Sequence, residues 1–230
     1  MTTFDLIDYY QFNLISPLNS VKKGTPCGHT MVEEMNEVLD MYLSKESIDK
    51  VLKRCVCDRH GHQYCIDSDA IDEAVKALMV CIHVSPFGKF PLVKGKKLVN
   101  SFADFEELYD FINSVIGGIS GIGALTVYDT TKRIGHLFDT PIYPKPYVYL
   151  NAGALDGARA LLGRNDLKFR ELTTLFEPYF GTFPSIFIED ILCIFKTVYR
   201  ANSINIKATE PSLKKAAGCV FSSKETLARV

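Results

Sequence analysis

The sequence predicts a mainly α-helical protein, built as a single multi-helix domain with a small irregular N-terminal part. Apolar residues recur at every third or fourth position along several segments, which is the period of one face of a helix. Capping residues precede many of these segments, and glycine or proline follows them. The chain has 230 residues, of which 47% are hydrophobic and 23% charged. A chain of this length and composition can bury one large core.

The first region, residues 1–100, is expected to begin irregularly and continue as helices with a Cys/His-rich loop. Glycine and proline interrupt residues 1–29, and a helix is expected from Thr30 onward. Ser47 is placed to cap a second, short helix. Asp67 or Ser68 is placed to cap a third helix, which must end before Pro86.

The second region, residues 101–200, is expected to hold the remaining helices. Ser101 and Asp104 form a capping arrangement for a helix that continues to the glycines near residue 117. The chain is expected to become helical again from Ala124 to Leu137. Residues 201–230 contain few apolar side chains, so we expect them to form a mobile C-terminal tail.

Three further helices are predicted beyond the proline-rich segment at residues 141–146. The first covers residues 152–162 and ends at Gly163, and its small residues favour close packing against another helix. The second covers residues 169–176. The third covers residues 185–199 and has Pro184 at its start.

The most informative segment is the glycine-rich stretch at residues 115–129, which lies between two predicted helices. Its centre reads Gly121-Ile122-Gly123, and Thr126 follows. Residues without a Cβ let the chain turn sharply and let another backbone approach closely. The first N–H groups of a helix lack partners within the helix, and the helix dipole favours an anion beside them. The segment therefore predicts a phosphate site made of main-chain amides.

This segment resembles the helix-hairpin-helix motif of DNA-repair glycosylases, polymerases and ligases. The likeness extends from roughly residue 111 to residue 135 and includes the Gly-apolar-Gly core and the downstream Thr126. Glycosylases of the lyase type have a Lys two residues past the second glycine, where this chain has Leu125. They also have an Asp further along, where residues 145–150 include no acid. The resemblance implies binding of a nucleic-acid backbone without the glycosylase reaction.

Charge is distributed unevenly along a chain whose net charge is −1. Acidic residues predominate over residues 30–75, and basic residues predominate over residues 124–170. A polyanion is therefore expected to prefer the second of these segments. The predicted nucleic-acid contacts are Gly121, Ile122, Gly123, Ala124, Leu125, Thr126, Lys132, Arg133 and Arg159.

These residues lead to two hypotheses about function. The first is a non-catalytic protein that binds DNA or another nucleic acid, independently of its sequence, through phosphate contacts at the glycine-rich segment. The second is a structural or protein-interaction domain in which this segment is only a packing element. An enzyme is the less favoured class, because no nucleophile, base and acid stand at a spacing that indicates catalysis.

Cysteine and histidine gather at residues 55–65, and the chain has seven cysteines in all. The candidate metal ligands are Cys55, Cys57, His60 and Cys65, which would suit a structural zinc ion. Their spacing differs from the usual pairs of zinc ligands, so a loop with reduced thiols and surface histidines is the alternative. Structural zinc is the one candidate cofactor.

The expected location is cytoplasmic, with no association with a membrane. The N-terminus lacks the basic and apolar regions of a secretory signal. No apolar run approaches the ~20 residues that span a bilayer. The odd number of unevenly spread cysteines favours reduced thiols over a disulfide framework.

Overall fold

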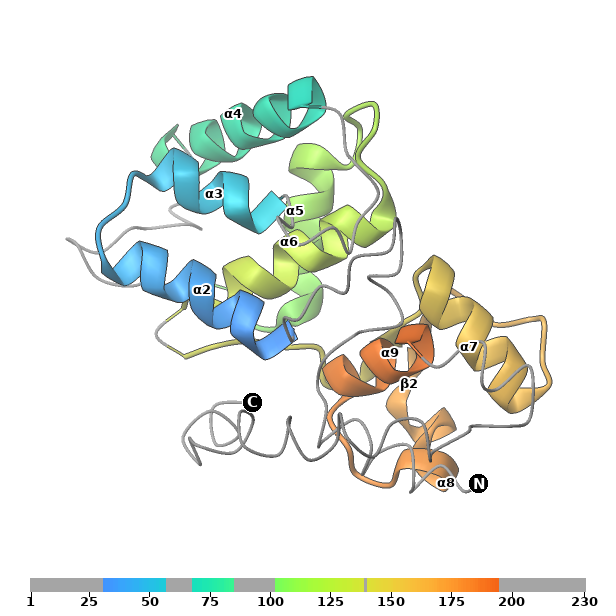
Figure 1. Cartoon of the computed structure of the whole chain (residues 1–230). Helices are drawn as coiled ribbons and strands as arrows, with labels where there is room; N and C mark the ends of the chain where they lie inside the picture. The colour runs from blue at the N-terminus through green and yellow to red at the C-terminus, as the bar shows by residue number, and fades with distance from the viewer. Residues whose placement is uncertain (1–30, 57–67, 85–101, 139, 195–230) are drawn as a thin grey trace, which may run out of the picture. The chain divides into compact units, whose positions relative to one another are not determined.

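The computed structural model describes residues 31–56, 68–84, 102–138 and 140–194. This part of the chain is mainly helical, which confirms the predicted mainly α-helical class, although it does not form the single domain that was expected (Figure 1). It divides into two compact units at the junction of Tyr143 and Pro144. The first unit is Val32–Tyr143, and the second takes in Met31 and the described residues from Pro144 onward.

The boundary between these units lies in the proline-rich segment, whereas the sequence-based division after residue 100 falls inside the first unit. Helices on both sides of residue 100 share one core, because α4 packs against α5 and α3 packs against α6. A loop separates domains only where few contacts cross it. Proline at positions 141, 144 and 146 provides the stretch that resists helix formation.

The first unit is built from helices that the spacing of apolar residues predicted. They are α2 (Met31–Leu43), α3 (Ile48–Val56), α4 (Ser68–Val84), α5 (Phe105–Ile116) and α6 (Ala124–His136). α3 pairs with α4 and α5 pairs with α6, and the two pairs meet through the α3–α6 and α4–α5 contacts (Figure 1). The loop that follows α5 leads into the N-terminus of α6.

Aromatic rings fill much of the core beneath α5 and α6. The rings of Phe105 and Tyr128 meet edge to face with centroids 5.9 Å apart. Those of Phe102 and Phe138 stack at 6.1 Å. All four side chains are buried, and burial of each such side chain stabilises the folded state by ~1.5–3 kcal/mol. This core fixes the two helices on either side of the glycine-rich loop.

Two side chains cap the N-terminus of α5 by accepting hydrogen bonds from main-chain amides. Asp104 accepts a hydrogen bond from the amide of Glu107 at 2.8 Å, and the Glu107 carboxylate accepts one from the amide of Ala103 at 2.9 Å. The sequence predicted a cap formed by Ser101 with Asp104. In the structure Asp104 is the N-cap residue itself, with Glu107 as its partner, and Ser101 lies outside the described residues.

The second unit combines helices with a short two-stranded sheet. Its elements are β1 (Tyr147–Tyr149), α7 (Ala152–Leu162), β2 (Arg170–Leu172), η1 (Thr173–Leu175), α8 (Glu177–Phe180) and α9 (Ser185–Ile194). The strands are antiparallel, with Val148 opposite Glu171. α9 packs against both α7 and β1. The predicted α7 and the start of α9 are confirmed.

The predicted helix at residues 169–176 is wrong, because this segment pairs with another part of the chain. It contains β2 and η1, and β1 lies beside it. The amide of Leu150 donates to the carbonyl of Phe169 at 2.7 Å, and the amide of Thr173 donates to the carbonyl of Pro146 at 2.9 Å. A short apolar run suits a helix or a strand, so its tertiary partner decides between them.

Close packing of α7 against α9 confirms the prediction drawn from the small residues of α7. A Cβ added at Gly157 would lie 2.0 Å from the carbonyl oxygen of Leu192 in α9. Only glycine fits there without movement of the backbone. Gly163 ends α7 with φ 64°, the left-handed conformation typical of a helix C-terminus.

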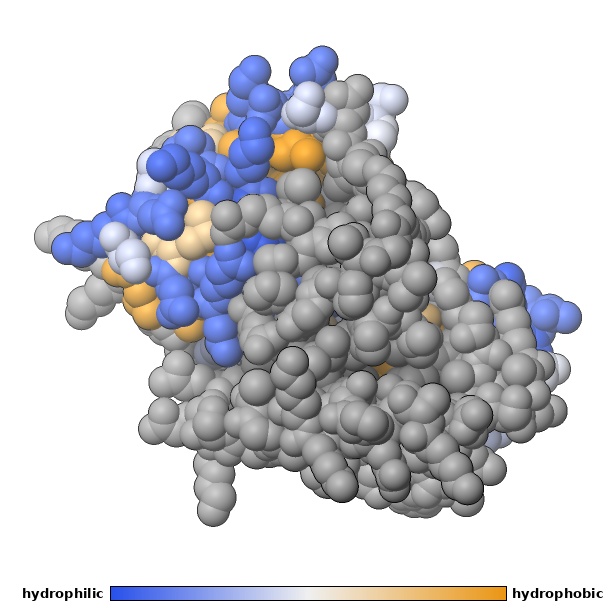
Figure 2. Space-filling view, viewed as in Figure 1, coloured by the Kyte–Doolittle hydropathy of each residue, from blue (hydrophilic) through white to orange (hydrophobic). Residues whose placement is uncertain are grey.

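The surface of the first unit is mainly hydrophilic on the face shown in Figure 2, with apolar patches among the charged residues. Leu43 and Val80 are its large exposed apolar side chains among the described residues. No helix in the described ranges has both the length and the apolar character needed to cross a bilayer.

Candidate functional site

The loop between α5 and α6, residues 117–123, is called the hairpin below. Local hydrogen bonds define its path. The amide of Gly117 donates to the carbonyl of Asn113 at 2.8 Å, which ends α5. The amide of Ile119 then donates to Ile116, and the amide of Ile122 donates to Ile119, at 3.1 and 3.0 Å. Two consecutive tight turns therefore reverse the chain before α6 begins.

At the Gly-Ile-Gly centre of the hairpin, the first glycine has a positive φ and the isoleucine is buried. Gly121 has φ 89°, a conformation that costs residues with a Cβ ~1–2 kcal/mol. An added Cβ there would lie 3.5 Å from the Cβ of Ala70, so the hairpin lies against the start of α4. Ile122 is 8% exposed, whereas Gly121 and Gly123 are both exposed. The isoleucine holds the tip in place while the glycines beside it face solvent.

The first turn of α6 has main-chain donors that no described residue accepts a hydrogen bond from. Gly123 is the N-cap residue in an extended conformation, φ −96° and ψ 171°, and it has no side chain to cap the helix. The first hydrogen bond into the helix runs from the amide of Val127 to the carbonyl of Gly123 at 3.1 Å. Among the described residues, no hydrogen bond is donated by the amides of Ala124 and Leu125. Ala124 is exposed and Leu125 is half-buried.

The electrostatics of this turn favour an anion, although one carboxylate lies nearby. The first turn of α6 contains no acidic residue, so the positive end of the helix dipole is not compensated there. The first turns of α3, α4 and α5 all contain acidic residues. Asp69 in α4 is exposed and stands next to Ala70, the residue that the hairpin contacts. It borders the hairpin with a negative charge.

Lys132 and Arg133 lie inside the first unit and not on its surface. Lys132 is 7% exposed, and its Nζ lies 2.7 Å from the carboxylate of Asp129. The same Nζ lies 4.6 Å from the centre of the Tyr128 ring, within the range of a cation–π contact. Its charge is therefore directed at partners in α6 itself.

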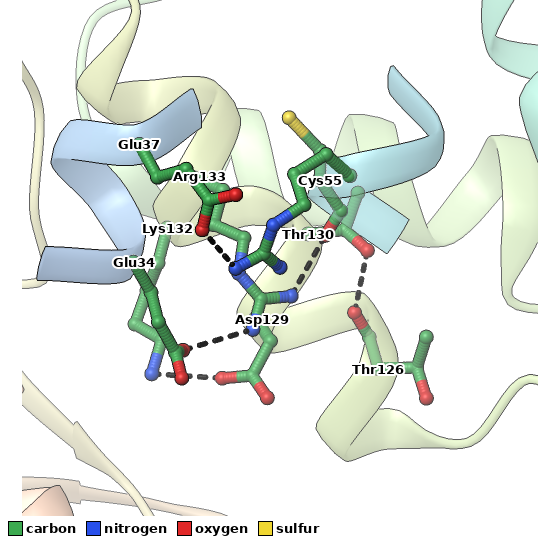
Figure 3. Close-up of polar contacts among 9 residues, drawn as sticks. Glu34, Glu37, Cys55, Thr126, Asp129, Thr130, Lys132 and Arg133 are labelled. Atoms are coloured by element: carbon green, nitrogen blue, oxygen red, sulfur yellow. Dashed lines mark hydrogen bonds and ion pairs between the residues drawn. The ribbon is translucent and has the colours of Figure 1, made fainter. Parts of the chain in front are cut away.

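Arg133 belongs to a buried polar cluster that joins α2, α3 and α6 (Figure 3). Its guanidinium donates to the carbonyl of Cys55 at 2.8 Å and lies 3.6 Å from the carboxylate of Glu34. Arg54 donates to Glu37 at 2.9 Å in the same region. Glu34 and Arg133 are 4% and 5% exposed. These charges hold helices together and leave the solvent-facing side of the hairpin without them.

The remaining predicted contacts occupy separate positions. Thr126 is 6% exposed, and its carbonyl accepts a hydrogen bond from the Thr130 hydroxyl at 2.7 Å. Arg159 lies in α7 of the second unit and is half-buried. The structure thus brings residues 121–126 together in one turn, places Lys132 and Arg133 in the interior of the same unit, and places Arg159 in the other unit.

The candidate zinc ligands are represented by Cys55 alone, since Cys57, His60 and Cys65 lie outside the described residues. Cys55 is buried near the end of α3, and this burial raises the pKa of its thiol to about 12. The thiol therefore keeps its proton at neutral pH. No group of three or more His, Cys, Asp or Glu side chains in the described ranges is arranged to hold a metal ion. The zinc site stays a prediction.

The acidic partners of Arg133 and Arg54 were missed by sequence reasoning, although the sequence contains a signal for them. Glu34 stands three residues after Met31 and four before Val38, so it shares the apolar face of α2. A carboxylate on such a face is rarely buried unless it is paired. The pattern therefore indicates a buried cation on a neighbouring helix.

Comparison with known proteins yields no similarity to build on. Protein-family models, curated proteins and solved structures were searched, and none of them matches this chain.

Proposed function

We propose that this chain is a non-catalytic nucleic-acid-binding protein that contacts a backbone phosphate through the amides of Gly123, Ala124 and Leu125. One observation carries the proposal. The start of α6 presents main-chain donors to solvent, with no side-chain cap and no acidic residue in the first turn. A phosphate accepts hydrogen bonds from such amides and is favoured by the helix dipole.

The mode of binding follows from the residues at the hairpin. Gly121 and Gly123 have no side chain, so a phosphate can approach the backbone closely. Ile122 points into the core and reads no base edge. Contacts to phosphates fix position without reading sequence. We therefore expect similar affinity for nucleic acids of different sequence.

The salt dependence should be shallow for a nucleic-acid-binding protein. The steep dependence typical of such proteins reflects counterions released when Lys and Arg neutralise phosphates. Lys132 and Arg133 are paired in the interior, so the hairpin contributes amides and not cations. A shallow slope together with measurable binding is the signature of this site.

The second candidate function is a structural or protein-interaction domain in which the hairpin only packs. Its support comes from the hairpin's internal contacts: Ile122 is buried, and Gly121 lies against α4. Asp69 beside that contact also disfavours a phosphate. The two functions differ in whether the amides of α6 acquire a partner when nucleic acid is added.

A pair of isosteric variants at Gly123 tests the proposal. An added Cβ at Gly123 meets nothing within 4 Å, and its extended backbone suits Asn and Asp as N-cap residues. Gly123→Asp fixes a negative charge where the phosphate would lie, whereas Gly123→Asn adds the same shape without charge. We expect Gly123→Asp to bind a short fluorescent duplex about tenfold more weakly than Gly123→Asn does, because two like charges about 4 Å apart repel each other by ~1–4 kcal/mol between bulk water and a protein surface.

The difference in duplex affinity between the two variants decides whether the phosphate binds at Gly123. Fluorescence anisotropy of the full chain, measured with two unrelated duplex sequences, should show the difference for both. Equal affinity of Gly123→Asp and Gly123→Asn would place any bound nucleic acid elsewhere on the protein. Absence of binding by the unmodified chain would leave the interaction-domain hypothesis in its place.

A further inference from the structure

We draw no further inference here: the strongest candidate, the surface patch around the exposed side chain of Leu172 on β2, carries none because nothing in the described part of the structure shows what covers it.

Discussion

The first turn of α6 and the rest of the same helix offer opposite kinds of chemistry. At its start, Gly123 and Ala124 are exposed and contribute only main-chain groups. From Thr126 to its end at His136, the helix is buried and includes charged residues with internal partners. Asp129 pairs with Lys132 in this buried part, and Arg133 reaches Glu34 in α2. The candidate site thus lies at the start of α6, where the side chains of Gly123 and Ala124 are small and the main chain is exposed.

This difference teaches that charge in a sequence does not by itself indicate where a polyanion binds. Lys132 and Arg133 follow the hairpin closely in sequence, yet Lys132 pairs with Asp129 within α6 and Arg133 joins α6 to α2 and α3. A buried charge requires a partner inside the protein, and it is then not available to a ligand.

The largest effect is expected from Arg133→Ala in the buried part. The substitution leaves the Glu34 carboxylate without its arginine and the Cys55 carbonyl without its donor. Breaking a buried ion pair by removal of one partner costs ~3–5 kcal/mol. Chemical denaturation should show this loss in the free energy of unfolding. Lys76→Ala, which removes an exposed cation of α4, is the control and should change it little.

An intermediate effect is expected from Gly121→Ala in the hairpin. The positive φ of Gly121 disfavours a residue with a Cβ, so the free energy of unfolding should fall by ~1–2 kcal/mol. Gly118→Ala is the matched control, since a Cβ there meets nothing within 4 Å and Gly118 does not have a positive φ. If both variants unfold at the same denaturant concentration, the hairpin does not depend on the left-handed turn.

The smallest effect on stability is expected from Gly123→Asn at the exposed start of α6. An N-cap side chain is more favourable than glycine by only a few tenths of a kcal/mol, because it satisfies one amide of the first turn. Thermal unfolding should therefore show a stability equal to or slightly above that of the unmodified chain. A marked loss would mean that the amides of this turn already have partners that the Asn side chain displaces.

The helices of the first unit were predictable because each has a local signal. Ser47 and Asp104 mark helix starts, and apolar residues at helical spacing mark the buried faces. The short strands were not predictable in this way, since β1 and β2 exist only through their pairing across Val148 and Glu171. Strand pairing is a contact between distant segments, and no local pattern specifies it.

The candidate site was predictable in its backbone and not in its charges. Two glycines around an isoleucine specify a tight, anchored turn, and the structure has Ile122 buried with Gly121 in the left-handed region. The positions of Lys132 and Arg133 depend on which helix covers them, and α2 supplies Glu34 from far along the chain.

NMR titration of the full-length ¹⁵N-labelled chain with a short DNA duplex tests the central claim most directly. The amides of Gly123, Ala124 and Leu125 should show the largest shifts, and they should do so with duplexes of unrelated sequence. Duplex binding with these three amides unmoved, or no binding at all, would contradict the claim that the uncapped start of α6 holds a nucleic-acid phosphate.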